Sequence, residues 1–169
     1  QLNSIEQWGF KENNINKLVL PESLEHIGLR AFQDNGLEEV IIPSSLKTIS
    51  GEAFSGGDED NDNRITKLSF KTPSKLEVIE SSAFYGNQLS EVELPASVVK
   101  IGGRAFYNNS LDSLTLPNIN KRFAVFNGWK DEEGTVIGQK QDGTTTVGDF
   151  WAAYEADIES YEDKYGSQQ

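Results

Sequence analysis

The sequence predicts a right-handed repeat solenoid with short parallel strands, followed by a small, mainly antiparallel β module at the C-terminus. Two observations predict the solenoid: one motif recurs through the first 118 residues, and three of its positions share one register. The third observation is that the period stops after Pro117, where the turn signals also change type. We therefore expect a solenoid over residues 1–118, a small β module over 119–156 and a polar tail over 157–169.

The register of the repeat is visible in three columns of identical residues. Within each column, one residue follows the previous one after 22 positions, except for a single spacing of 30. The longer spacing falls at the same point of the chain in all three columns. The columns consist of Pro21, Pro43, Pro73, Pro95 and Pro117, of Ile5, Ile27, Ile49, Ile79 and Ile101, and of Phe10, Phe32, Phe54, Phe84 and Phe106. Three columns in one register exclude coincidence and predict about five coils, of which the first is incomplete.

Each unit predicts the same elements in the same order. It begins with an apolar triplet such as Leu37, Val40 and Ile42, and the alternation of the last two is typical of a strand buried on one face. Proline ends the strand, and a second apolar pair, Leu46 and Ile49, follows. A small residue then precedes phenylalanine, whose ring can fill the centre of the coil. We expect one buried column of stacked rings at Phe32, Phe54, Phe84 and Phe106.

An asparagine stands two places before each strand opening, at Asn13, Asn35, Asn63, Asn87 and Asn109. It can adopt a left-handed turn conformation or bond a neighbouring backbone, and either role is structural. One coil of this size cannot bury its apolar face alone, so the coils should stack with their strands in parallel. At roughly 4.8 Å per coil, five coils would span roughly 24 Å.

The strand ending in Leu-Pro or Ile-Pro, followed by Ser-Leu, Ile-Gly and Ala-Phe, resembles the BspA-type (Treponema-type) leucine-rich repeats of bacterial surface proteins. The resemblance covers roughly residues 2 to 118. It implies a leucine-rich repeat solenoid that is exposed on a bacterial cell or secreted, with adhesion or binding of a protein partner, such as a host or matrix protein, as its role. It carries over no catalytic residue. Because the chain starts inside a repeat, we expect the natural protein to begin earlier, with any signal or anchor outside this segment.

The long spacing contains two insertions, six residues between Phe54 and Asn63 and two residues between Leu68 and Pro73. The first insertion creates a turn-prone loop over residues 56–64 with four carboxylates, Asp58, Glu59, Asp60 and Asp62. Alternating aspartates can present oxygens to calcium, but the glycine and the distal glutamate of an EF-hand are absent. A solvated acidic loop is the favoured interpretation, and calcium binding stays an open alternative.

The strings FNGWKDEEGTVI and TTTVGDFWAAYE, which lie beyond the repeats, resemble the Listeria-Bacteroides repeat, a small β-grasp-like module of bacterial surface proteins. Turn signals at Asn127-Gly128, Glu133-Gly134 and Asp142-Gly143 separate short apolar stretches, which favours antiparallel strands. The pair Phe150-Trp151 near the final strand departs from the family pattern. Because the 22-residue period stops here and the turn signals change type, we expect a separate unit that the repeats do not need in order to fold.

The composition excludes several classes of function. A net charge of -12 without a basic cluster disfavours nucleic acid, and no stretch of 18 apolar residues is present for membrane insertion. The absence of cysteine removes thiol catalysis and cysteine-bound metals, and His26 has no second imidazole with which to form a metal site or a relay. We therefore predict no catalytic residue, no cofactor, no metal site and no enzymatic activity.

Two pairs of residues are candidates for binding a protein partner. Tyr85 and Tyr107 follow the core phenylalanine in neighbouring coils, so stacking should place them side by side, where tyrosine is a favourable interface anchor. The alternative is that they merely shield the turn edge. Glu91 and Glu93 lie on the strand between them, on another face, and form a weaker candidate patch. The predicted function is thus a non-enzymatic protein-binding or adhesion module, and the alternative is a structural spacer or stalk segment of a larger surface protein.

Overall fold

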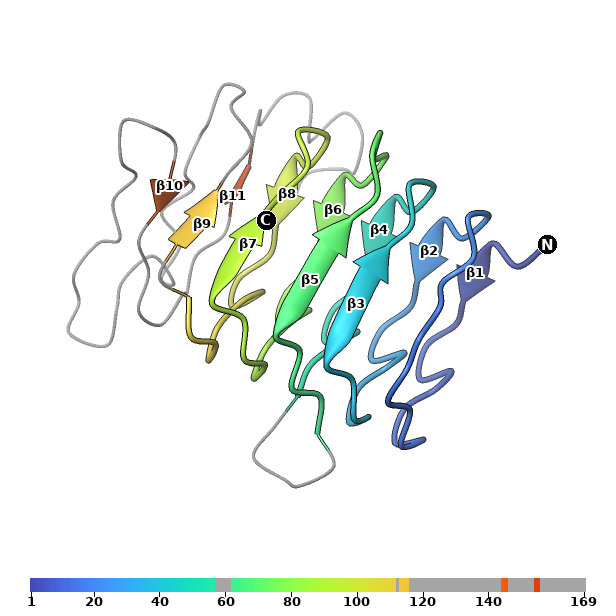
Figure 1. Cartoon of the computed structure of the whole chain (residues 1–169). Coiled ribbons are helices and arrows are strands. Elements are labelled where there is room, and N and C mark those ends of the chain that lie inside the picture. The colour runs from blue at the N-terminus through green and yellow to red at the C-terminus, as the bar shows by residue number, and fades with distance from the viewer. Residues whose placement is uncertain (57–61, 112, 116–143, 146–153, 156–169) are drawn as a thin grey trace.

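The computed structural model describes residues 1–56 and 62–111 and the short segments 113–115, 144–145 and 154–155. The described residues contain no helix, and those up to residue 115 form a solenoid of parallel strands whose successive coils stack along one axis (Figure 1). This architecture confirms the predicted solenoid. It arises because every coil repeats the same apolar positions, so that each coil covers the apolar face of its neighbour.

The first sheet takes one short strand from each coil. Its parallel strands are β1 (Ser4–Ile5), β2 (His26–Ile27), β4 (Thr48–Ile49), β6 (Val78–Ile79) and β8 (Lys100–Ile101). The isoleucines pair in register from Ile5 to Ile101, and all five are buried. A further strand, β11 (Tyr154–Glu155), pairs antiparallel with β8. The isoleucine column of the sequence is therefore the buried side of this sheet.

The second set of strands ends at the proline column and forms two separate sheets. One sheet pairs β3 (Glu39–Ile42) with β5 (Lys67–Phe70) in parallel. The other pairs β7 (Glu91–Glu93) in parallel with β9 (Ser113–Thr115), which also pairs antiparallel with β10 (Thr144–Thr145). Residues 17–20, the repeat-equivalent segment of the first coil, form no strand and no ladder with β3, so this set of strands begins one coil later than the first sheet.

The division into a solenoid and a separate module over residues 119–156 stays a prediction. Most of that module, and with it the resemblance to the Listeria-Bacteroides repeat, lies outside the described residues. Its two described segments, β10 and β11, each extend a solenoid sheet with an antiparallel strand. The tail over 157–169 also lies outside the described residues.

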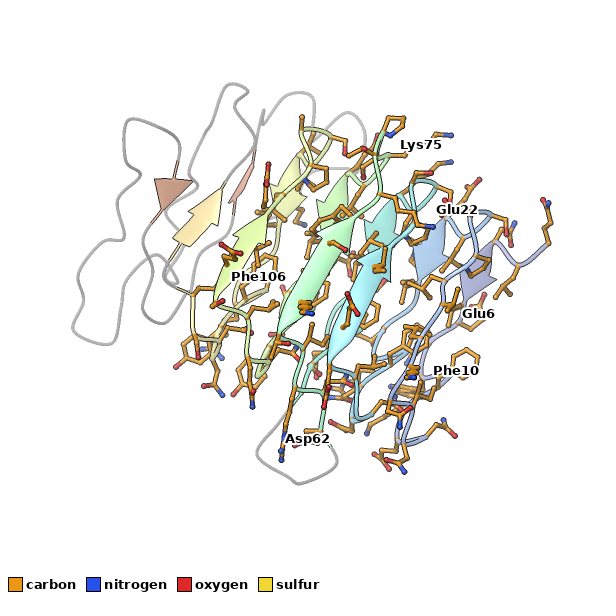
Figure 2. The ribbon with its side chains drawn as sticks, in the orientation of Figure 1. Glu6, Phe10, Glu22, Asp62, Lys75 and Phe106 are labelled. Carbon is orange, nitrogen blue, oxygen red and sulfur yellow. The ribbon has the colours of Figure 1, made fainter. Side chains whose placement is uncertain are left out.

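The phenylalanine column is confirmed as a continuous stack of rings. Consecutive ring centroids lie 5.3 to 5.5 Å apart, and the planes of neighbouring rings differ by 1 to 8°. Phe32, Phe54, Phe84 and Phe106 are buried, whereas Phe10, at the N-terminal end of the stack, is 42% exposed. Figure 2 labels Phe10 and Phe106, the two ends of the column. The alanines that precede these rings leave room for the turn to close over them.

The asparagine column bonds the backbones of neighbouring coils, which decides between the two roles predicted for it. The Asn35 Oδ1 atom accepts hydrogen bonds from the backbone N–H groups of Asn13 and Ile15, and its Nδ2 donates to the carbonyls of Phe10 and Phe32. The left-handed conformation belongs to other columns instead. It occurs three residues after the isoleucine, at Trp8, Arg30, Glu52, Ser82 and Arg104, and again in the turn just before the asparagine.

Close approach of two backbones explains the glycine in the Ile-Gly pair at Gly102. A Cβ atom there would lie 2.4 Å from the Ser81 N atom and 2.6 Å from the Glu80 carbonyl carbon. We expect Gly102→Ala to lower the free energy of unfolding by about 1 to 3 kcal/mol, because the two coils would have to move apart. Urea melts measure the loss. The matched control is Gly103→Ala, whose Cβ would meet nothing within 4 Å, and an equal loss in both variants would contradict the explanation.

Candidate functional site

The described surface combines a tyrosine pair, a polar network and an open cleft, in different places on the coils. The tyrosine pair lies in the turns that follow the phenylalanine column. Tyr85 and Tyr107 stack with ring centroids 5.7 Å apart and an angle of 25° between the planes, and both are half-buried. The Arg104 guanidinium lies 6.0 Å from the centre of the Tyr107 ring, a distance at the limit of a cation–π contact. The structure therefore brings these two predicted residues together.

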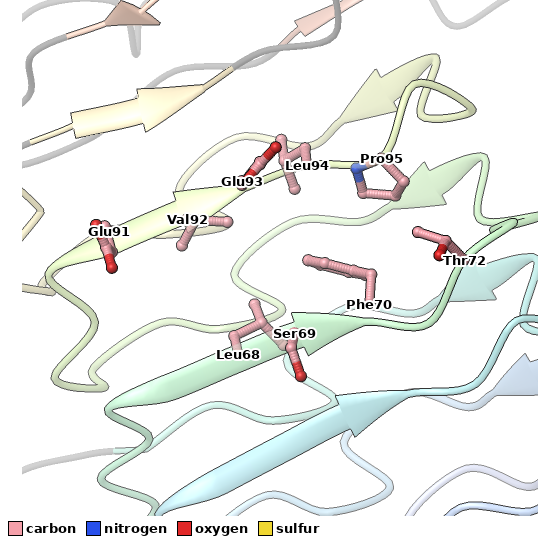
Figure 3. Close-up of a pocket in the computed structure, with 9 residues that line it drawn as sticks. All are labelled: Leu68, Ser69, Phe70, Thr72, Glu91, Val92, Glu93, Leu94 and Pro95. Atoms are coloured by element: carbon pink, nitrogen blue, oxygen red, sulfur yellow. The ribbon is translucent and has the colours of Figure 1, made fainter.

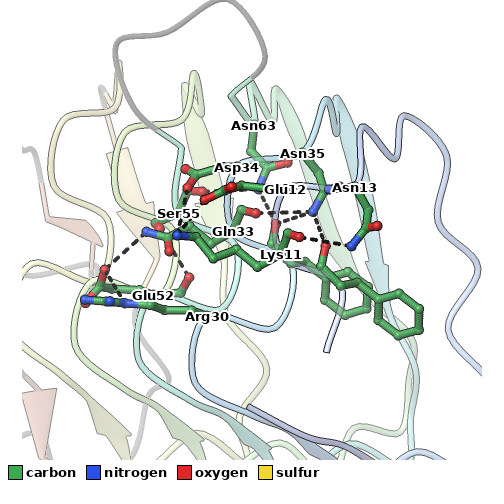
Figure 4. A network of polar contacts seen from close by, with 12 residues as sticks. Lys11, Glu12, Asn13, Arg30, Gln33, Asp34, Asn35, Glu52, Ser55 and Asn63 are labelled. Carbon is green, nitrogen blue, oxygen red and sulfur yellow. Dashed lines mark hydrogen bonds and ion pairs between the residues drawn. The ribbon is translucent and has the colours of Figure 1, made fainter. Parts of the chain in front are cut away.

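The same turn edge carries charged and amide side chains in the earlier coils (Figure 4). Arg30 donates two hydrogen bonds to the Glu52 carboxylate, at 3.0 and 3.1 Å, and Gln33 donates a third at 3.3 Å. Lys11 lies 3.7 Å from Asp34, and burial raises the pKa of Asp34, with a further contribution from the carboxylate of Asp62. The early part of this edge is thus internally paired.

A cleft opens between β5 and β7, where the second set of strands is interrupted (Figure 3). The cleft has a volume of about 480 Å³. Its lining residues are Leu68, Ser69, Phe70, Thr72, Glu91, Val92, Glu93, Leu94 and Pro95. The insertion at Lys71-Thr72 directly follows β5, and the sheet is split beside it. Leu68 and Phe70 are half-buried here, whereas their counterparts Val40 and Ile42 in the preceding coil are buried.

Glu91 and Glu93, the other two predicted residues, are exposed on β7 and line this cleft. They lie on the strand face, whereas Tyr85 and Tyr107 lie in the turns, so the prediction that the two pairs occupy different faces agrees with the structure. Sequence reasoning missed Leu68 and Phe70 as the opposite wall. The signal that could have found them was the two-residue insertion, since it breaks the spacing directly after these positions.

The acidic loop is only partly described, because residues 57–61 lie outside the described part of the chain. Asp62 is buried at the edge of the loop, with 8% of its surface exposed. Among the described residues no group of three or more histidine or carboxylate side chains is arranged to hold a metal ion. The choice between a calcium site and a solvated loop therefore stays open. Within the same residues no helix is long and apolar enough to cross a membrane.

The family comparison identifies the repeat. The chain matches the model of the BspA type leucine rich repeat region in six copies, over residues 1–67 and 60–126. The match covers the whole of the described solenoid and ends eight residues beyond the boundary predicted at 118. No curated protein sequence matches the chain.

Two solved structures are similar to the chain. The structure of the pneumococcal vaccine antigen PcpA shares 32% identity with a TM-score of 0.63, over 73% of this chain and 30% of that one. The structure of a leucine rich cell surface protein from Faecalibacterium prausnitzii A2-165 shares 17% identity with a TM-score of 0.55, over 84% of this chain and 34% of that one. The second likeness supports the fold alone. The chain therefore spans about a third of the length of either protein.

Proposed function

Because the chain belongs to the BspA-type leucine-rich repeat family, we propose that it is a non-enzymatic module that binds a protein partner at or outside a bacterial surface. The family and the fold are those of leucine-rich repeat surface proteins. The similar structure that shares 32% identity is named as a pneumococcal vaccine antigen, which supports a surface or secreted location. Adhesion to a host or matrix protein is the form of binding that we propose.

The tyrosine pair is the observation that carries this proposal. Tyr85 and Tyr107 are stacked, half-buried and accompanied by Arg104, and aromatic and arginine side chains dominate the energetic centres of protein interfaces. Each ring already packs on its neighbour, so a partner would order little additional side-chain freedom on binding. The repeat-equivalent positions in the preceding coils hold Gln33 and Ser55, so the pair is confined to the later coils.

We expect the double variant Tyr85→Ser and Tyr107→Ser to weaken partner binding at least about tenfold, the loss typical of removing an aromatic anchor. The partner is first isolated by pull-down from extracellular matrix and cell-surface fractions, and its affinity for each variant is then measured by calorimetry. Val19→Ser is the matched control, because it removes an apolar side chain that is 94% exposed on another coil. Undiminished affinity in the tyrosine variant, with an unchanged melting curve, would show that the pair only shields the turn edge.

A spacer or stalk is the second candidate function, and the continuity of the core favours it. The ring stack runs unbroken from Phe10 to Phe106, and backbone hydrogen bonds such as Phe54 N–H to Ala83 C=O join each coil to the next. Such a solenoid can hold another domain at a fixed distance. If the chain is only a spacer, neither the tyrosine variant nor any other surface variant should change the affinity for a protein isolated by the pull-down.

A further inference from the structure

We propose that the cleft between β5 and β7 is a docking site for a lysine or arginine side chain on an extended segment of a partner protein. This inference rests on the proposed function as a protein-binding module and names the chemistry of what one part of its surface accepts. It goes beyond the tyrosine pair because the cleft lies on the strand face, among different residues.

The cleft exists because two neighbouring strands do not pair. β5 pairs with β3 and β7 pairs with β9, and no backbone hydrogen bond joins β5 to β7. In a parallel strand, backbone groups alternate between the two edges, so the facing edges of β5 and β7 carry N–H and C=O groups without a strand partner. An extended chain lying over the cleft can bond to such groups.

The floor and the rim of the cleft differ in chemistry. Leu68, Phe70, Val92 and Leu94 supply apolar surface, and the half-buried ring of Phe70 points into the opening in Figure 3. Glu91 and Glu93 alone supply charge among the lining residues. A lysine or arginine side chain matches both features, because its methylene stem packs on apolar surface while its head reaches a carboxylate.

The cations close to the cleft in sequence do not neutralise these carboxylates. Lys71 directly follows β5 but contacts Glu22 two coils away, and that hydrogen bond lowers the pKa of the Glu22 carboxyl group. Lys67 is exposed at the start of β5 and is not among the lining residues. Glu91 and Glu93 form no ion pair with a described residue. No cation of the described residues therefore neutralises the charge of the cleft, which leaves both carboxylates able to accept a lysine or arginine of a partner.

The test uses the full chain, labelled with ¹⁵N, and the peptide acetyl-Val-Lys-Val-Lys-Val-amide as the probe. We expect shifts of the amide resonances of Leu68–Phe70 and Glu91–Leu94, and weaker binding when salt is raised from about 20 mM to about 500 mM, which shortens the screening length to roughly 4 Å. The double variant Glu91→Gln and Glu93→Gln should weaken peptide binding about fivefold or more. Glu39 on β3 is the repeat equivalent of Glu91, but it lies in the β3–β5 pair and does not line the cleft. The variant Glu39→Gln should therefore bind the peptide like the unaltered chain.

Two further probes separate the contributions. The peptide with glutamate in place of lysine should not bind, and the peptide with glycine in place of valine should bind more weakly. The proposal is overturned if the shifts are absent, if they spread over the acidic surface, or if the glutamine variant binds equally well. The tyrosine variant should bind the peptide normally, so failure of the cleft is distinguishable from failure of the proposed function, which would appear as the absence of a specific partner in the pull-down.

Discussion

Replacing Phe84 with alanine is expected to lower the free energy of unfolding by about 3 to 5 kcal/mol. The Phe84 ring is fully buried and stacks on Phe54 and Phe106 at 5.3 and 5.5 Å, so its removal leaves a cavity between two coils. Ala83, beside it, is also buried and too small to fill that space. Equilibrium denaturation in urea, followed by circular dichroism, measures the loss.

Phe10 supplies the matched control, because it is the same residue type in the same column. Its ring stacks on Phe32 at 5.4 Å but is 42% exposed, so Phe10→Ala creates no closed cavity and should cost about a third as much or less. A loss of less than about 1 kcal/mol in the Phe84 variant would count against the coil register.

The second large effect is expected for Asn87→Ala. The Asn87 Oδ1 atom accepts a hydrogen bond from the backbone N–H of Ile65 at 3.0 Å, and Nδ2 donates to the carbonyls of Phe54 and Phe84 at 2.9 and 3.1 Å. Alanine would leave the Ile65 N–H and the Phe54 carbonyl without a side-chain partner inside the solenoid, whereas the Phe84 carbonyl would still accept from Asn109 Nδ2 at 2.9 Å. Since each unsatisfied buried group costs about 1 to 3 kcal/mol, we expect a loss of roughly 3 kcal/mol.

Asn13 tests whether burial and bonding cause this effect. It occupies the same column but is exposed, and its side chain donates only to the carbonyl of Lys11. Asn13→Ala should therefore change the free energy of unfolding by about 0.5 kcal/mol or less. The account of the asparagine column would be wrong if the two variants melted alike. Hydrogen exchange at Ile65 gives a second readout, because its amide should lose protection in the Asn87 variant alone.

The core of the solenoid could be predicted from the sequence because equivalent positions of a repeat have equivalent burial. Ile49 and Phe54 recur at fixed places, so their environment could be inferred from their equivalents in other coils. The left-handed conformations of Arg30 and Glu52 could not be inferred in this way. Long charged residues give no composition signal for that conformation, and the hydrogen bonds between coils impose it there, as from Arg30 N–H to Gly51 C=O.

The candidate site was predictable only in part, for a related reason. Tyr85 and Tyr107 share a repeat position, so their stacking followed from the register. The cleft at Glu91 and Glu93 depends on how far β5 stands from β7, and the separation of two strands is not encoded in the period of their side chains. The Lys71-Thr72 insertion showed that the register was disturbed without showing that the sheet would split.

The point at which the acidic loop leaves the solenoid is suited to the insertion of a foreign peptide. The Gly56 N–H donates to the Tyr85 carbonyl at 2.7 Å, and a Cβ on Gly56 would lie only 2.3 Å from the Asn63 carbonyl oxygen, so the two ends of the loop meet. Directly after the loop, Asn63 continues the column of asparagine hydrogen bonds by donating to the carbonyls of Phe32 and Ser55. Lengthening a loop with touching ends costs only about 0.6 kcal/mol per doubling. This junction is thus a natural graft point, where an epitope or a labelling peptide can be spliced in without disturbing the coils on either side.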